Sequence, residues 1–401
     1  MEETVLKGHN IIYFGPDTWD GLWRTRQQIM SMFATQNKVL FVEGLPLSIR
    51  RALAGFPRGE LGLSDCRRPS LRRISENLHT FRYPIWAPIS LRFPYSQLTG
   101  IVRRLSLRYV LRKLQMSEPI VWFHRPEMID LVNDIPSPRL LLYHVVDEYA
   151  AYPCLTPAKC RRIEEREKEM MAFVDAVIVV SKKLYEAKRP FNPNTYLVPN
   201  GVNYEAYTAA LADPYLPDDL RVIRTPRLGY SGLIGDRLNL TMLKELAQEN
   251  PQWSLVFLGK VSVSQQAETW RALRALPNVH YLGSVGISQV PHYVKGFQVG
   301  LMPYLQNREA EYISPMKLYD YLVAGLPIAS VDIPAAREFS QHIHLANSPH
   351  NFWQAVRSAL ADTTPERRQA RRKVAAQHTW EARIEQLSDL IQAQLVAKTP
   401  R

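Results

Sequence analysis

Short apolar runs rich in β-branched residues alternate with longer segments of helical periodicity along this chain. This alternation is typical of parallel β-sheets whose strands are joined by crossover helices. It begins at "NIIYF" (10–14) and begins again at "RLGYSG" (227–232), after a stretch rich in Pro and Asp. We therefore expect an α/β chain of two domains, for which 401 residues are sufficient.

The same alternation predicts the individual elements. The expected strands are "NIIYF", "KVLFVE", "PIVWF", "LLLYHVV", "DAVIVVS" and "TYLVP" in the first half, and "RLGYSG", "WSLVFLG", "NVHYLG", "QVGLMP" and "PIASV" in the second. One helix is expected to begin near Gly21. Another, "AKCRRIEEREKEMMAFV", carries Glu164 and Lys168, which can pair on a solvated face.

We place the domain boundary near residues 205–225. The expected domains are an N-terminal one, 1–205, and a C-terminal one, 220–378. A last helix of about 380–401 follows a break near His378, and Thr379 can cap it.

Composition and the first residues favour a cytoplasmic protein. The three cysteines are too few and too irregularly spaced for a disulfide framework or a zinc site. The acidic start "MEETVLKGHN" is unlike a signal peptide. No apolar run approaches the roughly 20 residues that span a bilayer, so we expect a soluble or peripheral protein.

The positive charge is concentrated in residues 50–113. This segment has 14 Lys or Arg and three acidic residues, whereas the net charge of the whole chain is +12. Its basic residues alternate with apolar ones, a pattern typical of proteins that bind anionic membrane surfaces. The residues expected at such a surface are Phe81, Trp86, Phe93 and Tyr95, with Arg82, Arg92, Arg103, Arg104, Arg108, Arg112 and Lys113. A solvated irregular surface is the alternative; no recognised nucleic-acid-binding module is present, and we expect no nucleic-acid partner.

Three segments carry the chemistry. In "YLVPNGVNYEAY" (196–207), Asn200 and Gly201 permit a tight turn after a strand. In "RLGYSGLIGDRLNL" (227–240), Gly232 and Gly235 open a helix, where backbone amides can approach a phosphate and Arg237 can bind a diphosphate. A solvated surface arginine is the alternative for Arg237.

The third segment, "EYISPMKLYDYLVAGLPIASVD" (311–332), is the most specific. Ser314 and Pro315 are expected to be the cap and first residue of a helix. The amides of Met316, Lys317 and Leu318 would then point at an anion, and the charge of Lys317 would add to them. One turn further, Asp320 can accept hydrogen bonds from the hydroxyls of a ribose. The alternative is a capped helix with a Lys–Asp ion pair.

These motifs resemble those of the retaining GT-B glycosyltransferases, in a branch of bacterial cell-surface polysaccharide enzymes close to the teichuronic-acid type. The matching segments are "VPNGV", "GYSGLIGDRLNL", "SPMKLYDYLVAGLPI", "HTWEARIEQL" and, upstream, "YHVVDEYAAY". The resemblance implies two Rossmann-like domains facing a cleft, with acceptor binding by the N-terminal one and a nucleotide-sugar donor bound mainly by the C-terminal one. It also implies that the final helix, about 380–401, crosses back to the first domain. It further implies that no metal or other cofactor is needed.

By position, Asp320 matches the second glutamate of the family's paired-glutamate motif, the one that binds ribose. The first glutamate would fall at Tyr312, which departs from the pattern; Glu309 and Glu311 are nearby candidates for its role, or surface acids.

Carboxyl ends of parallel strands are where ligands bind in such sheets. The polar residues expected there are His124, His144, Asp147 and Glu148, with Asp147 preferred on the acceptor side. The expected catalytic residues are Asp147 and His124 from these strand ends, and Arg237 and Lys317 from the expected donor site. Gly15 is also expected on the acceptor side, and Arg24 and Arg26 are either acceptor contacts or helix-surface charges.

We expect a metal-independent hexosyltransferase that uses a glycan or lipid-linked acceptor. A nucleotide-sugar epimerase of the same fold is one alternative. A non-catalytic binding protein, suggested by Tyr312, is the other.

Overall fold

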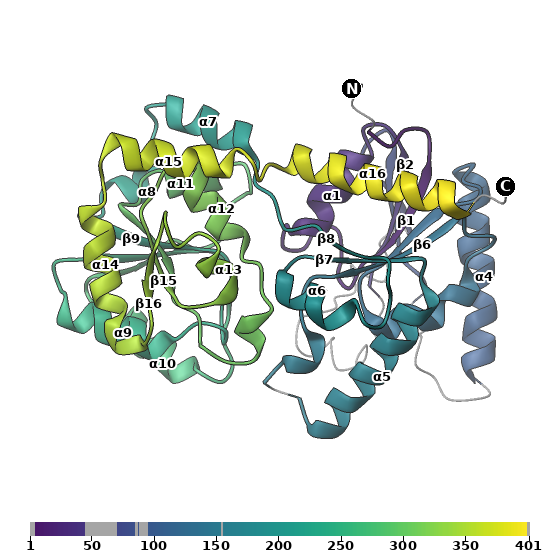
Figure 1. Cartoon of the computed structure of the whole chain (residues 1–401), viewed down its shortest axis with the longest axis horizontal. Helices are drawn as coiled ribbons and strands as arrows, with labels where there is room; N and C mark the ends of the chain where they lie inside the picture. Colours follow the sequence, from purple (N-terminus) through teal and green to yellow (C-terminus); the bar gives the residue numbers. More distant parts are fainter. Residues whose placement is uncertain (1–4, 45–69, 85–86, 88–94, 154, 399–401) are drawn as a thin grey trace. The chain divides into compact units, whose positions relative to one another are not determined.

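The computed structural model describes residues 5–44, 70–84, 87, 95–153 and 155–398. The chain divides into two compact units (Figure 1): Met1–Val198 with Ile384–Arg401, and Pro199–Arg383. The division thus lies ahead of the predicted boundary at 205–225. The expected linker belongs to the second unit, because Leu220 and Ile223 are buried in that unit's core.

The described part of the first unit contains an eight-stranded sheet in the order β3-β4-β2-β1-β5-β6-β7-β8. Its strands are β1 (Asn10–Phe14), β2 (Lys38–Val42), β3 (Leu71–Arg73), β4 (Leu78–Phe81), β5 (Ile120–Phe123), β6 (Leu140–Val145), β7 (Ala176–Val179) and β8 (Thr195–Leu197). All neighbours are parallel except β3 and β4. The central strands β5, β6 and β7 are buried throughout, as expected of a sheet covered on both faces.

The C-terminal helix α16 (Trp380–Lys398) lies mostly in this first unit. The other helices of the unit connect its strands. They are α1 (Thr25–Phe33), α4 (Tyr95–Lys113), η1 (Pro126–Asp134), η2 (Tyr149–Ala151), α5 (Pro157–Phe173) and α6 (Lys182–Lys188). Helix α1 begins at Thr25, later than the predicted Gly21, because Arg24 is extended and acts as its N-cap. The cap predicted for α16 is confirmed: the Ala382 amide donates to the Thr379 hydroxyl at 3.2 Å.

The structure differs from the prediction in two charged segments, helix α5 and the basic segment 50–113. The charged run of α5 is not only a solvated face, because its Glu167 is buried and bonded to Lys188. In the basic segment, Phe81 is buried in β4, and Arg103 is buried in an ion pair with Asp134 at 2.7 Å. Neither can therefore lie at a membrane surface. Trp86, Arg92 and Phe93 lie outside the described residues.

The second unit is built on a six-stranded parallel sheet in the order β13-β11-β9-β14-β15-β16. Its strands are β9 (Arg227–Ser231), β11 (Ser254–Leu258), β13 (Val279–Tyr281), β14 (Val299–Met302), β15 (Ile328–Val331) and β16 (His344–Ala346), and a separate pair is formed by β10 (Ile234–Gly235) and β12 (Val261–Ser262). Helices α9 and α10 lie on one side of the large sheet, and α11 and α15 lie on the other (Figure 1). This is a Rossmann-like unit, in agreement with the alternation in the sequence.

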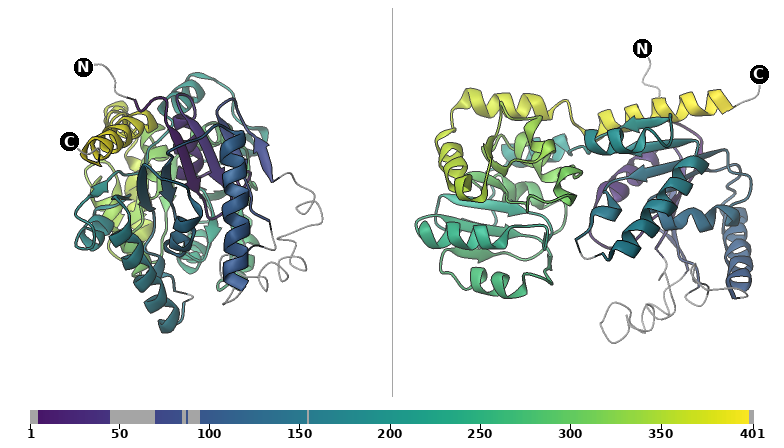
Figure 2. Two further views of the ribbon diagram at one scale, coloured as in Figure 1. Left: turned by 90° about the vertical axis from the view of Figure 1, so that its right-hand side faces the viewer. Right: turned by 60° about the horizontal axis from the view of Figure 1, so that its bottom comes forward.

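The helical segments of the second unit are α7 (Tyr204–Ala212), α8 (Asp218–Arg221), α9 (Leu240–Glu249), α10 (Ala267–Arg274), α11 (Val290–Val294), η3 (Glu309–Glu311), α12 (Met316–Val323), α13 (Pro334–Arg337), η4 (Pro349–Asn351), α14 (Phe352–Ala361) and α15 (Pro365–Ala375). The view at the right of Figure 2 shows α14 and α15 at the surface of this unit. Asn239 caps α9 and Thr364 caps α15 through their side-chain oxygens.

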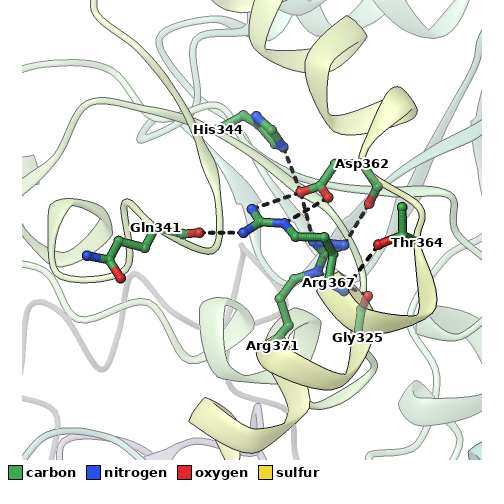
Figure 3. Close-up of polar contacts among 7 residues, drawn as sticks. All are labelled: Gly325, Gln341, His344, Asp362, Thr364, Arg367 and Arg371. Atoms are coloured by element: carbon green, nitrogen blue, oxygen red, sulfur yellow. Dashed lines mark hydrogen bonds and ion pairs between the residues drawn. The ribbon is translucent and has the colours of Figure 1, made fainter.

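The C-terminal end of α12 is fixed by a cluster around Asp362 (Figure 3). The buried Arg371 donates to the Gly325 carbonyl oxygen at 3.2 Å and to the Asp362 carboxylate at 2.9 Å. Arg367 and His344 bind the same carboxylate. Gly325 has a φ of 71°, and a Cβ there would meet Arg368 at 2.4 Å, so glycine is required. The cluster therefore holds in place the helix that carries Lys317.

Among the described residues, no helix has both the length and the apolar composition that crossing a membrane requires.

Candidate functional site

The second unit gathers a set of basic and aromatic groups where β9 and β14 end. The chain leaves β9 through Gly232, whose φ is 133°. A Cβ at this position would lie 3.3 Å from Cε of Lys317. Glycine therefore permits both the backbone conformation and the close approach of this loop to the lysine.

Lys317 lies in the first turn of α12 and is surrounded by tyrosines. Its ammonium donates a hydrogen bond to the Tyr304 hydroxyl at 2.7 Å and lies 4.7 Å from the centre of the Tyr230 ring. Burial by itself would lower the pKa of Lys317, but the hydroxyl oxygens of Tyr230 and Tyr304 raise it above its ordinary value. The side chain is therefore a fixed, half-buried positive charge.

Arg237 is the second basic residue of this site. Its guanidinium forms an ion pair with Glu309 at 2.6 Å, and its side chain is 41% exposed, whereas that of Glu309 is 8% exposed. The backbone around Arg237 is connected to the surroundings of Lys317. The Leu305 amide donates to the Arg237 carbonyl oxygen at 2.8 Å, and the neighbouring Tyr304 is the hydrogen-bond partner of Lys317. Glu309 is thus a buried partner of Arg237, not a surface acid, while Glu311 is exposed.

The start of α12 differs in detail from the prediction. Pro315, with an extended ψ of 118°, is the N-cap, and Met316 is the first helical residue. Ser314 does not cap the helix: its carbonyl oxygen accepts from the Asn200 side chain at 2.7 Å, and its side chain is bonded to Tyr319. The Leu318 amide donates a hydrogen bond to the Pro315 carbonyl oxygen within this turn, so it is already bonded inside the helix. At the start of α12, the groups that can attract an anion are therefore the helix dipole and the Lys317 ammonium.

Asp320 lies on α12, one turn beyond Lys317. Burial raises its pKa to about 7, while the neighbouring Tyr207 hydroxyl of α7 and the charge of Lys317 act in the opposite direction. A carboxylate in this position can accept hydrogen bonds from vicinal hydroxyls when it is ionised. Tyr312, at the position of the missing glutamate, is half-buried.

The first unit has its own polar cluster at the carboxyl ends of β1, β5 and β6. The Tyr13 hydroxyl lies 2.8 Å from Nδ1 of His124, and the Tyr149 hydroxyl donates to the His124 carbonyl oxygen at 2.8 Å. Burial and the nearby Arg26 lower the pKa of His124 well below its ordinary value, so its ring is neutral. Arg26 is itself buried and paired with Asp17, which excludes a role as a helix-surface charge.

The other predicted residues of this cluster have distinct surroundings. His144 is buried, and its Nδ1 has no hydrogen-bond partner within the described part of the chain. Burial lowers its pKa to about 4. Asp147 is half-buried and accepts a hydrogen bond from the Tyr152 hydroxyl at 3.0 Å. Gly15 follows β1 and packs against the ring of Phe41.

Glu148 was also predicted to lie on the acceptor side, but its surroundings argue against that role. It is buried and accepts from the Lys188 ammonium at 2.6 Å. The same ammonium donates to Glu167 at 2.6 Å, and Glu167 also accepts from the Tyr143 hydroxyl. A carboxylate bonded in this way within the unit is not presented to an acceptor.

Sequence reasoning did not identify several residues of these clusters. They are Tyr13, Tyr207, Tyr230, Tyr304 and Lys188. Tyr13 and Tyr230 lie inside predicted strands, and the alternation of a buried strand does not distinguish a core tyrosine from one beside a site.

The described residues include no group of three or more His, Cys, Asp or Glu side chains that could bind a metal ion.

Comparisons with known proteins bear on the fold and the family of the chain. Residues 238–389 match the family described as "Glycosyl transferase-like". Over 217 residues the chain is 27% identical to a relative named for teichuronic acid biosynthesis, the glycosyltransferase TuaH of Bacillus subtilis (strain 168). That match covers 52% of this chain and 52% of the relative, so it spans about half the relative's length.

Similar solved structures cover nearly all of the chain. Sucrose-phosphate synthase from Thermosynechococcus elongatus has a TM-score of 0.68 at 15% identity, with 97% of this chain and 100% of that chain covered. A trehalose-6-phosphate structure from E. coli bound with UDP-2-fluoro glucose has a TM-score of 0.62 at 12% identity, with 98% and 99% covered. The chain therefore has the GT-B fold, and residues 238–389, most of which lie in its second unit, are similar to the glycosyl transferase-like family.

Proposed function

We propose that this protein transfers a hexose from a nucleotide-diphosphate sugar to a cell-surface glycan or a lipid-linked acceptor. The observation that carries the proposal is the position of Lys317 in the first turn of α12, against Gly232 and Tyr304. A fixed ammonium, a helix N-terminus and the Arg237 guanidinium form a basic site of the kind that binds a diphosphate.

The roles of the residues follow from this placement. Lys317 and Arg237 bind the diphosphate and stabilise the negative charge that develops on it as the sugar leaves. Asp320 accepts hydrogen bonds from the ribose hydroxyls. Because two cations and a helix dipole supply the positive charge, we propose that transfer does not require a metal.

We also propose that transfer retains the configuration at the anomeric carbon. The bond from that carbon to the diphosphate oxygen breaks, a bond to the acceptor hydroxyl oxygen forms on the same face, and the acceptor proton passes to the leaving diphosphate. His124 and Asp147 at the strand ends of the first unit are the groups that we propose to bind the acceptor. The relative named for teichuronic acid biosynthesis supports a cell-surface glycan as the acceptor, and hence action at the inner face of the cell membrane.

Donor binding and turnover test the proposal in two steps. A thermal-shift screen with UDP, GDP and ADP sugars should identify one donor that raises the melting temperature, since a ligand at 100 times its Kd stabilises by about 2.7 kcal/mol. Sugar transfer or slow donor hydrolysis should then persist in excess EDTA. An enzyme that only interconverts two nucleotide sugars would indicate an epimerase, and binding without any turnover would indicate a binding protein.

A further inference from the structure

Helix α4 has an apolar face that points away from the core of its unit. Five large side chains lie along it, with exposed fractions between 45% and 66%: Tyr95, Leu98, Ile101, Leu105 and Tyr109. Their spacing of three or four residues places them on one side of the helix. We call these five residues the α4 ridge.

The opposite side of the same helix is the one that packs on the unit. Its buried residues include Thr99, Leu107 and Val110, and Arg103 makes its buried ion pair with Asp134 of η1. Figure 2 shows α4 along its full length at the surface of the first unit. A surface helix normally presents polar residues to solvent on this side, so the exposed ridge requires a different explanation.

The charge around the ridge has one sign. Between Tyr95 and Lys113 the sequence contains no aspartate or glutamate. Arg108, Arg112 and Lys113 are exposed and Arg104 is half-buried. At 100° per residue, Arg112 falls among the ridge residues, while Arg108 and then Arg104 lie beyond one edge of the ridge, next to Ile101. A partner for this face must therefore accept apolar side chains and carry negative charge nearby.

We propose that the α4 ridge binds the surface of an anionic lipid bilayer, with α4 parallel to the membrane plane. Leu98, Ile101 and Leu105 would enter the boundary between headgroups and acyl chains, and the arginines would lie among the lipid phosphates. Tyr95 and Tyr109, one at each end of the ridge, combine an apolar ring with a hydroxyl and suit the headgroup level.

A second copy of the chain fits this face less well. A symmetric pair formed through the ridge would place two copies of the same positively charged helix, which has no acidic residue, against each other. Like charges placed together in an interface oppose association. A bilayer that contains anionic lipid supplies instead the charge that the ridge lacks.

Vesicle co-sedimentation of the full chain tests the proposal. The protein should pellet with vesicles of phosphatidylglycerol and phosphatidylcholine and not with phosphatidylcholine alone. The variant Arg108→Gln/Arg112→Gln should lower the partition coefficient by roughly 25-fold, about fivefold for each arginine. The variant Leu98→Ser/Leu105→Ser should lower it by at least about tenfold.

Matched variants from the same unit control for general surface effects. Arg161→Gln/Arg162→Gln removes two exposed arginines of α5, and Val396→Ser removes an apolar side chain of α16 that is 67% exposed. Both should bind the vesicles like the unsubstituted protein. Raising the salt from physiological concentration to about 1 M shortens the Debye length from about 8 Å to 3 Å, so it should weaken binding by the unsubstituted protein much more than by Arg108→Gln/Arg112→Gln.

Three results would overturn the proposal. The protein could show no preference for anionic vesicles, or the ridge variants could bind like the controls. Sedimentation analysis could instead show a dimer that Leu98→Ser/Leu105→Ser converts to monomers, which would make the ridge a protein interface.

This inference does not depend on sugar transfer, because it is measured by lipid binding alone. Donor titration of the ridge variants should match that of the unsubstituted protein. Failure to bind vesicles with normal donor binding would refute the ridge proposal only, and failure to bind any donor with normal vesicle binding would refute the proposed function only.

Discussion

Lys317 on α12 and Tyr304, which follows β14, are joined by a hydrogen bond of 2.7 Å from the ammonium to the phenol oxygen. The two residues are 13 positions apart in sequence, and the contact fixes the lysine at the N-terminal turn of its helix. Because the ammonium also lies over the ring of Tyr230, its direction is set before a ligand arrives. A positive charge held in this way needs little reorganisation to bind a diphosphate.

Replacing Lys317 by Ala should weaken binding of the nucleotide-sugar donor by about 10- to 100-fold. The reason is the loss of a hydrogen bond to a charged group, which contributes about 1.5–3 kcal/mol. Lys373→Ala, which removes an exposed lysine of α15, is the matched control. Calorimetric titration gives both affinities, and equal Kd values for the two variants would contradict the assignment of Lys317 to the donor site.

The ion pair between Arg237 and Glu309 predicts coupled effects. Arg237→Gln should weaken donor binding by about tenfold or more, because a charge-assisted contact to the diphosphate is lost. Once Arg237 is gone, Glu309 has no guanidinium to orient, so the double variant Arg237→Gln/Glu309→Gln should bind the donor about as Arg237→Gln does. A double-mutant cycle measures this coupling; purely additive effects would show that Glu309 acts independently of Arg237.

Donor binding should become tighter as the pH rises from 6 to 8. The pKa of Asp320 is raised to about 7, so its carboxylate is mostly protonated at pH 6 and mostly ionised at pH 8. If only the carboxylate binds ribose, the affinity should increase by roughly tenfold. Asp320→Asn should abolish this dependence while lowering the affinity at pH 8, as measured by titration calorimetry.

The same group makes an opposite contribution to the stability of the unliganded protein. Its pKa in the folded protein is above the ordinary value of 3.8, so the folded state favours the protonated form. Stability from this group is present below the unfolded pKa and is lost as the pH rises towards about 7. Urea unfolding from pH 4.5 to 8 should show this loss in the unsubstituted protein and a smaller one in Asp320→Asn.

Lys188→Ala should destabilise the first unit by about 3–5 kcal/mol, because it leaves the buried carboxylates of Glu148 and Glu167 without their partner. Lys188→Met combined with Glu148→Gln and Glu167→Gln removes all three charges and should recover most of that loss. Urea unfolding reports both values. A mild effect of Lys188→Ala, or no recovery in the triple variant, would show that unpaired buried charge is not the cause of the loss.

The elements of the fold were largely predictable. All eleven strands expected from apolar runs are present, because a strand covered on both faces needs a continuous apolar sequence. Strands β3, β4, β10, β12 and β16 were missed because they are only two to four residues long, and β3 has no fully buried residue. The division into two units lies ahead of the expected 205–225, because the residues rich in Pro and Asp form α8 and bury Leu220 in the second unit.

By itself the sequence determined the two α/β halves, the glycine at position 232, and a basic residue in the first turn of the helix at 316–323. These features depend on local periodicity and local backbone conformation, which neighbouring residues specify. Only the tertiary structure decided which distant side chains meet. It placed Tyr304 against Lys317, buried Glu309 beneath Arg237 and enclosed Glu148 with Lys188. Such pairings depend on burial and on the packing of separate elements, and no local pattern encodes either.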